Sequence, residues 1–286
     1  MKTGLVLEGG AMRGMFTAGV LDVLMEAGVA VDGAVGVSAG AAFGCNYKSR
    51  QIGRAIRYNM TYCRDPRYCS LRSLVRTGDL YGVDFCYRVI PMELDPFDVE
   101  TFARNPMPFY AVCTDLRTGK PVYHLLQNGG EEDMAWIRAS ASMPMVSRIV
   151  RLDGHELLDG GIADSIPLRF FESIGYERNI VVLTQPQGFI KEKNRYLPLL
   201  RVALRKYPKA FRALAQRHEA YNEAVRYVRQ REEEGAAFVL CPDEPLHIGA
   251  VERDAGRLRA VYEAGRAVTG RRLPAMQAFL AAAHGE

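Results

Sequence analysis

The chain has 286 residues, of which 48% are hydrophobic and 24% are charged, and its formal net charge at pH 7 is +4. These values are typical of a globular protein with one large α/β domain, or with one domain and an appendage. They do not indicate a nucleic-acid partner. No stretch approaches the ~20 consecutive apolar residues of a membrane-spanning helix, so we expect any membrane contact to be peripheral.

The six cysteines and five histidines are dispersed along the chain, and no C-x-x-C pair occurs. This spacing excludes a disulfide framework and argues against a structural zinc site. The first residues lead directly into a strand and show no secretory signal. We therefore expect a cytoplasmic protein, possible contact with the inner face of the membrane, and neither metal nor cofactor.

The first forty residues predict two neighbouring parallel strands. Residues 5–7 form a short apolar run, which is followed by a glycine-rich turn at residues 9–14. Apolar residues then recur at helical spacing between Val20 and Met25, and Gly28 is a suitable left-handed end for that helix. A second strand follows at residues 33–37. The carboxyl ends of such strands form the binding crevice of an open α/β sheet.

The second strand ends in the pentapeptide Gly36-Val37-Ser38-Ala39-Gly40. Small residues on both sides of Ser38 allow the sharp strand-to-helix turn that exposes a nucleophilic hydroxyl. The earlier turn can direct backbone N–H groups towards a developing oxyanion. A hydrolytic site is the first hypothesis, and a tight junction with an inert serine is the alternative.

The remaining pattern predicts a mixed α/β body followed by helices. Residues 50–90 are interpreted as helical cover over one edge of the sheet. Hairpins are expected at 109–125 and, through a tight Asp153-Gly154 turn, at 148–158. Helices are also expected at 39–47, at 131–141 and over most of the chain after 198. Strands are expected at 180–183 and 237–241. The change in pattern near residues 185–193 divides the chain into a catalytic part, 1–188, and a helical part, 189–286.

The turn at residues 9–14 has a rival interpretation as a dinucleotide-binding loop. However, Ala11 stands at the second glycine of that fingerprint, and Asp32 precedes the second strand instead of ending it. A P-loop lysine is absent. Nucleotide binding is therefore the weaker hypothesis.

Asp159-Gly160-Gly161 supplies a candidate base for the serine. An ordinary aspartate has a pKa near ~3.9 and is a poor base, but burial beside the nucleophile would raise that pKa. His218 or His247 could complete a triad instead. Neither has a glycine-rich loop setting, and Ser38 follows only one strand and one helix, so a serine–aspartate dyad fits better.

Together these motifs resemble the patatin-like phospholipase family, here a bacterial member, over residues 4–185. The stretch 139–144, Ala-Ser-Ala-Ser-Met-Pro, is also similar to the segment that precedes the aspartate in that family. The resemblance implies a three-layer α/β/α sandwich with a mainly parallel sheet, a Ser38–Asp159 dyad, no metal, and hydrolysis of the acyl esters of phospholipids or lysophospholipids. The expected site residues are the oxyanion donors Gly9, Gly10 and Ala11, with Arg13, Gly14, Gly36, Gly40, Gly160 and Gly161 in support.

Two residues depart from the family pattern. Ala11 stands where a third glycine is usual, which is tolerable if its φ is negative. Glu8 places a carboxylate at the mouth of the turn, where we expect it to repel an anionic head group or to face solvent.

Residues 191–217 carry nine lysines and arginines against a single glutamate, interleaved with apolar residues. A basic amphipathic segment suits an anionic membrane surface. The alternative is a solvated helix packed on the body. A non-catalytic lipid-binding regulator with the same fold is the second functional hypothesis, and the oligomeric state is not indicated.

Overall fold

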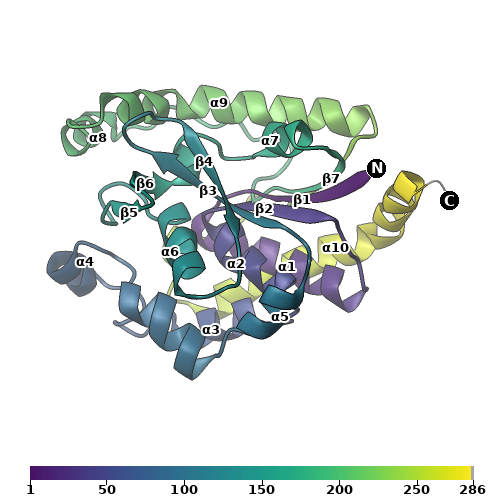
Figure 1. The fold of residues 1–286 in the computed structure, drawn as a ribbon, viewed down its shortest axis with the longest axis horizontal. Coiled ribbons are helices and arrows are strands. Elements are labelled where there is room, and N and C mark those ends of the chain that lie inside the picture. The colour runs from purple at the N-terminus through teal and green to yellow at the C-terminus, as the bar shows by residue number, and fades with distance from the viewer. Residues whose placement is uncertain (285–286) are drawn as a thin grey trace.

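A mixed sheet with helices on both faces forms the centre of the molecule (Figure 1). The computed structural model describes residues 1–284. The sheet has eight strands in the order β5-β6-β3-β2-β1-β7-β8, and β4 pairs with β3. The strands are β1 (Lys2–Leu7), β2 (Gly33–Val37), β3 (Phe109–Asp115), β4 (Pro121–Leu126), β5 (Val150–Leu152), β6 (His155–Asp159), β7 (Tyr176–Val182) and β8 (Ala237–Leu240).

The middle of the sheet is parallel and one side is antiparallel. β1, β2, β3, β7 and β8 run in the same direction, whereas β4 and β6 run antiparallel to β3. Leu7 therefore ends level with Gly36, and Val37 pairs with Val112. This register gathers the carboxyl ends of the parallel strands at one edge, as the sequence predicts.

Alternate residues of the buried strands face opposite layers. Leu5 and Leu7 belong to the core beneath the sheet in Figure 1, whereas Val6 belongs to the core above it. The helices are α1 (Gly14–Glu26), α2 (Ala39–Lys48), α3 (Arg54–Tyr62), α4 (Leu71–Thr77), α5 (Val99–Arg104), α6 (Glu131–Ser140), α7 (Leu168–Ser173), α8 (Leu197–Ala203), α9 (Pro208–Glu233) and α10 (Ala255–His284), with the short helices η1 (Ala11–Arg13), η2 (Phe85–Leu94) and η3 (Gly160–Ile162). The layers α1, α2, α10 and α7, α9 enclose the sheet, so the expected α/β/α architecture is confirmed.

Three local features that the sequence predicts are found in the structure: the end of α1, the tight hairpin turn and the helical segment at residues 50–90. α1 ends at Glu26, and Gly28 has a φ of +66° with the N–H of Val29 bonded to the Leu24 carbonyl. Asp153 and Gly154 both have positive φ, which matches the twist of a tight hairpin. Residues 50–90 are largely helical.

The last hundred residues are closely joined to the rest of the chain. β8 extends the same sheet beside β7, and α10 packs against α1. At this crossing a Cβ on Gly19 would lie 2.1 Å from the Tyr262 carbonyl oxygen, so only glycine permits the approach. The division at residues 188 and 189 stays a prediction. Within residues 1–284, no helix has the length and apolar content that a bilayer span requires.

Candidate active site

Ser38 occupies a strained turn between β2 and α2. Its φ is +54° and its ψ is −118°, a conformation that non-glycine residues rarely adopt and that costs about 1–3 kcal/mol. A Cβ on Gly36 would lie 2.5 Å from the Gly40 carbonyl oxygen, and one on Gly40 would lie 2.5 Å from that of Leu7. Both glycines are therefore required by close backbone packing, and the turn has the geometry of a nucleophile elbow.

A buried serine from α6 supports this turn. The Ser140 hydroxyl accepts a hydrogen bond of 2.9 Å from the Ser38 N–H and donates one of 2.6 Å to the Val112 carbonyl. Both Ser140 and Val112 are fully buried. The strand β3 and the helix α6 thus fix the position of the Ser38 backbone.

The glycine-rich turn after β1 lies directly against Ser38. A Cβ on Gly9 would lie 3.1 Å from the Ser38 Cβ, and one on Gly14 would lie 2.7 Å from the Ala39 Cβ. Within the described chain, the N–H groups of Gly9, Gly10 and Ala11 donate no hydrogen bond to another protein group. Unpaired donors beside a nucleophile are the arrangement that an oxyanion hole requires.

One expectation about this turn is wrong, and the condition attached to another is not met. The φ of Ala11 is +48°, so the condition under which its methyl group would be unstrained is not met. Glu8 does not line the mouth of the turn, since it is only 1% exposed. Its carboxyl accepts hydrogen bonds from the Thr184 N–H at 2.6 Å and the Tyr221 hydroxyl at 2.9 Å. Glu8 therefore connects the turn to the segment that follows β7 and to α9.

Asp159 reaches the same edge of the sheet at the end of β6. It pairs with Cys113 on β3, one residue beyond Val112, the partner of Val37. Its Oδ1 accepts a 2.8 Å hydrogen bond from the Gly161 N–H. Burial raises the pKa of Asp159, whereas the neighbouring Ser38 side chain, the charge of Arg217 and the Gly161 N–H act in the opposite direction. A buried carboxyl with a raised pKa beside a serine is suited to accept a proton.

The supporting residues lie around these groups. A Cβ on Gly160 would lie 2.1 Å from the Val112 carbonyl oxygen, and one on Gly161 would lie 3.1 Å from an Arg217 guanidinium nitrogen. Arg13 lies in η1, within the glycine-rich turn at residues 9–14. The candidate site residues are therefore brought together at one edge of the sheet, although their chemical roles stay predictions.

The alternative sites lack the expected contacts. In the described chain, no histidine forms a hydrogen bond or ion pair with Ser38 or Asp159, and His218 instead approaches Glu219. Asp32 accepts hydrogen bonds from the backbone and hydroxyl of Thr3, at the start of β1. Its carboxylate therefore lies at the opposite end of the strand from the glycine turn, which removes the ribose partner of a dinucleotide site.

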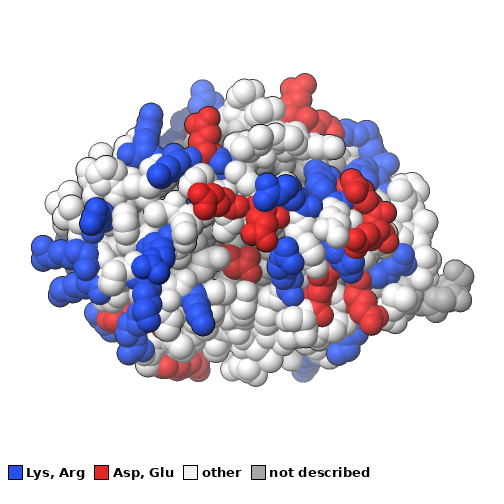
Figure 2. Space-filling model, turned by 90° about the horizontal axis from the view of Figure 1, so that it is seen from above, with Lys and Arg blue, Asp and Glu red and all other residues white. Residues whose placement is uncertain are grey.

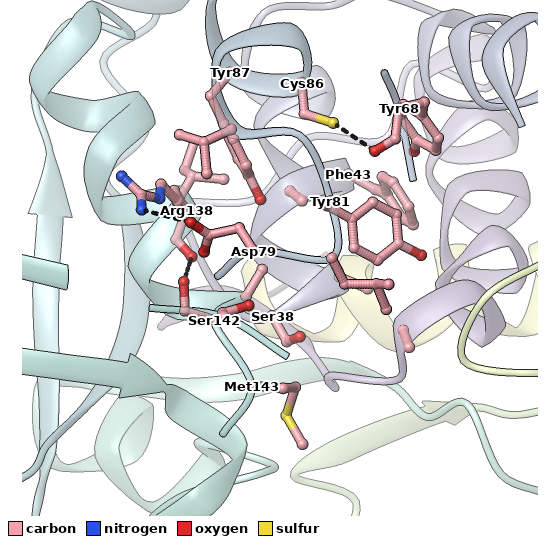
Figure 3. A pocket seen from close by; sticks show the side chains of 18 of the residues that line it. Ser38, Phe43, Tyr68, Asp79, Tyr81, Cys86, Tyr87, Arg138, Ser142 and Met143 are labelled. Carbon is pink, nitrogen blue, oxygen red and sulfur yellow. Dashed lines mark hydrogen bonds and ion pairs between the residues drawn. The ribbon is translucent and has the colours of Figure 1, made fainter. Parts of the chain in front are cut away.

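A largely apolar cavity of about 200 Å³ opens beside Ser38. Figure 3 shows Ser38 and Met143 towards one end of this cavity and Tyr68, Cys86 and Tyr87 towards the other. The walls come from α2, α3, η2 and α6, so the helical segment at residues 50–90 supplies one side of the site. A hydrocarbon chain fits such a lining.

Sequence reasoning missed three residues that contact the site. Ser140 is predicted only as part of the segment 139–144, Arg217 only as a cation of the basic segment 191–217, and Tyr221 has no predicted role. Arg217 donates through Nε to the Gly161 carbonyl, and Tyr221 donates to Glu8. These two residues lie one helical turn apart in α9, and that i, i+4 spacing of polar residues on a long helix is the only signal the sequence offers.

The fold and the site define an α/β/α protein with a strained serine elbow beside a turn of unpaired backbone donors. A model of the patatin-like phospholipase family matches residues 5–171, and a domain family of unknown function, DUF6363, matches residues 207–281. The chain belongs to the patatin-like phospholipase family.

Relatives among the curated proteins agree with this assignment. The chain is 31% identical to the uncharacterized protein YjjU of Escherichia coli K12, over 93% of this chain and 75% of that protein. It is 28% identical to an uncharacterized NTE family protein of Mycobacterium tuberculosis, over 63% of this chain and 48% of that protein. A lysophospholipase, nte1 of Aspergillus terreus, is 27% identical over 61% of this chain but only 11% of its own length. Among solved structures, VipD of Legionella pneumophila aligns with a TM-score of 0.48 and 13% identity, over 96% of this chain and 67% of that chain.

Proposed function

We propose that the protein is a serine hydrolase that cleaves acyl esters of phospholipids or lysophospholipids. Membership of the patatin-like phospholipase family supports a lipid hydrolase. The observation that carries the finer proposal is the placement of Ser38 between the carboxyl of Asp159 and the apolar cavity. An ester whose acyl chain occupies the cavity would present its carbonyl carbon to the Ser38 hydroxyl.

In the proposed reaction Ser38 Oγ attacks the carbonyl carbon while Asp159 accepts the hydroxyl proton. The N–H groups of Gly9, Gly10 and Ala11 stabilise the negative oxygen of the tetrahedral intermediate. The intermediate collapses, and the alcohol leaves with the proton held by Asp159. Water then attacks the acyl-enzyme, again with Asp159 as base, and releases the fatty acid and free Ser38.

Hydrolysis of a lysophospholipid by wild type, Ser38→Ala and Asp159→Asn tests this proposal. Both variants should lose several orders of magnitude in kcat, because the nucleophile and its base act as a unit. Ser142→Ala is the matched control, since Ser142 also lines the cavity but donates its hydroxyl to the Arg138 carbonyl. Lipid binding without turnover by wild type and both variants would instead identify a non-catalytic lipid-binding protein.

We also propose that an anionic membrane surface delivers the substrate. Within residues 191–217 the apolar side chains divide into two sets, because Leu200, Leu204 and Leu214 pack on the body whereas Leu199 and Val202 are exposed. Figure 2 shows lysines and arginines gathered at the left-hand end of the molecule, where α8 lies in Figure 1.

α4 carries a second set of exposed apolar residues at the same end of Figure 1. Leu71 and Val75 are 74% and 86% exposed, one helical turn apart, and Arg72 and Arg76 lie beside them. Exposed apolar groups flanked by arginines complement the hydrocarbon boundary and the anionic head groups of a membrane.

A further inference from the structure

Three cationic side chains gather beside the candidate active site without forming an ion pair. Arg13 comes from η1, Lys191 from the segment after β7, and Arg217 from α9. The charges of Arg13 and Arg217 both act on Lys191, whose pKa falls to about 8, chiefly because it is desolvated. No acidic side chain in the described chain lies within salt-bridge distance of any of the three.

The carboxyls of Glu8 and Asp159 interact electrostatically with the cluster, so two acidic groups face three cationic ones. Burial raises the pKa of both carboxyls. Lys191 Nζ lies 4.3 Å from the ring centroid of Tyr221. Like charges held together in a partly buried setting favour the binding of an anion.

Two polar atoms at this place also lack partners. Arg13 Nε and Thr184 Oγ1 are buried and form no hydrogen bond with the described chain. A Cβ on Gly10 would lie 2.6 Å from Thr184 Oγ1, so this hydroxyl is adjacent to the candidate oxyanion donors. Buried polar atoms are normally hydrogen-bonded, and an unpaired donor beside two further cations is suited to an anionic ligand.

The helix α9 and the apolar cavity lie on opposite faces of the sheet. The cavity is walled by α2, α3, η2 and α6, on the Leu5 and Leu7 side of the sheet, and none of the three cations lines it. α9, which supplies Arg217, packs on the Val6 side. An ester with its acyl chain in the cavity would therefore extend its alcohol part towards the cluster.

We propose that Arg13, Lys191 and Arg217 bind the phosphodiester of the substrate head group, and so make the enzyme selective for glycerophospholipid esters over uncharged ones. This inference rests on the proposed function, and it gives the α9 region a role in recognition of the substrate. Lys191 and Arg217 are positioned to contact the phosphate oxygens on the alcohol side of the scissile bond.

The test compares a short-chain lysophosphatidylcholine with the monoacylglycerol of the same acyl chain. Wild type should have a kcat/KM at least tenfold higher for the phosphate-bearing ester, and Lys191→Met should reduce that ratio by about tenfold, the effect of one charge-assisted hydrogen bond. Lys193→Met is the control, because Lys193 is exposed on the same segment and should leave the ratio unchanged. Equal efficiency on both esters, or an unchanged ratio in Lys191→Met, would overturn the proposal.

Binding to Ser38→Ala separates this inference from the proposed catalysis. The variant should bind lysophosphatidylcholine more tightly than monoacylglycerol, and the added substitution Lys191→Met should abolish the difference. That result supports the phosphate site even if wild type hydrolyses neither ester, in which case only the proposed function fails. If inorganic phosphate binds to the cluster while the two lipids bind equally, the site holds a free anion and the head-group proposal is wrong.

Discussion

Arg217 donates a hydrogen bond to the carbonyl of Gly161, the residue whose own N–H bonds to the Asp159 carboxyl. The guanidinium also opposes the effect of burial on Asp159, since its charge lowers the pKa of that carboxyl. A residue of the DUF6363 region thus contacts the loop that carries the candidate base.

We predict that Arg217→Met raises the pKa of Asp159 further and moves the acid limb of the pH dependence of kcat/KM to higher pH. The base must be deprotonated to act, so activity is lost as the pH falls through its pKa, and that loss now begins at a higher pH. The other groups that act on Asp159 are Ser38 and the Gly161 N–H, which the variant retains. Arg212→Met, an exposed change on α9, should leave the profile in place. An unmoved acid limb in Arg217→Met would contradict this account of Asp159.

We predict that Ser140→Ala lowers the free energy of unfolding by about 2 kcal/mol and reduces kcat by about tenfold or more. The change leaves the buried N–H of Ser38 without a partner and removes one hydrogen bond to the Val112 carbonyl, and an unsatisfied buried group is costly. Urea unfolding and steady-state kinetics measure the two effects. Ser142→Ala, two residues further on, should change neither by a comparable amount, and equal effects in both variants would refute the positioning role.

We predict that Ala11→Gly raises the free energy of unfolding by about 1 kcal/mol, because glycine adopts a positive φ without steric cost. Ala220→Gly is the matched control, since Ala220 lies in the helix α9 and the same exchange there should cost about 1 kcal/mol. Both changes are measured by urea unfolding. A loss of stability in Ala11→Gly would mean that the turn is not strained at this residue.

We predict that Val75→Glu and Val202→Glu each weaken binding to vesicles of mixed phosphatidylcholine and phosphatidylglycerol by about tenfold, because a carboxylate replaces an exposed apolar group at an anionic surface. Cosedimentation measures the bound fraction. Val99→Glu is the control, since Val99 is also exposed but begins α5, away from α4 and α8. If all three variants bind as wild type does, neither patch contacts the membrane.

The parts of the fold and the site that the sequence predicts are those that depend on hydrophobic periodicity and on backbone geometry at single residues. Periodicity and glycine placement predict the strands and helices around Ser38, since the sharp turn and the end of α1 depend on backbone geometry at single residues. The family resemblance then predicts that Asp159 lies in the same site as Ser38. The burial of Glu8 and the φ of Ala11 were not predictable, because both depend on how a turn packs against distant elements.

The contacts that α9 makes with the candidate site were not predictable for the same reason. Arg217 and Tyr221 lie within the basic segment and just beyond it, where charge pattern alone favours a solvated or membrane-facing helix. Only tertiary packing turns one face of that helix towards Gly161 and Glu8.

Covalent labelling with a fluorophosphonate, followed by peptide mapping, tests the central claim most directly. The probe reacts with activated serine hydroxyls, so wild type and Ser142→Ala should carry it on Ser38, and Asp159→Asn should react far more slowly. Labelling of another residue, or labelling that persists in Ser38→Ala, would contradict the account.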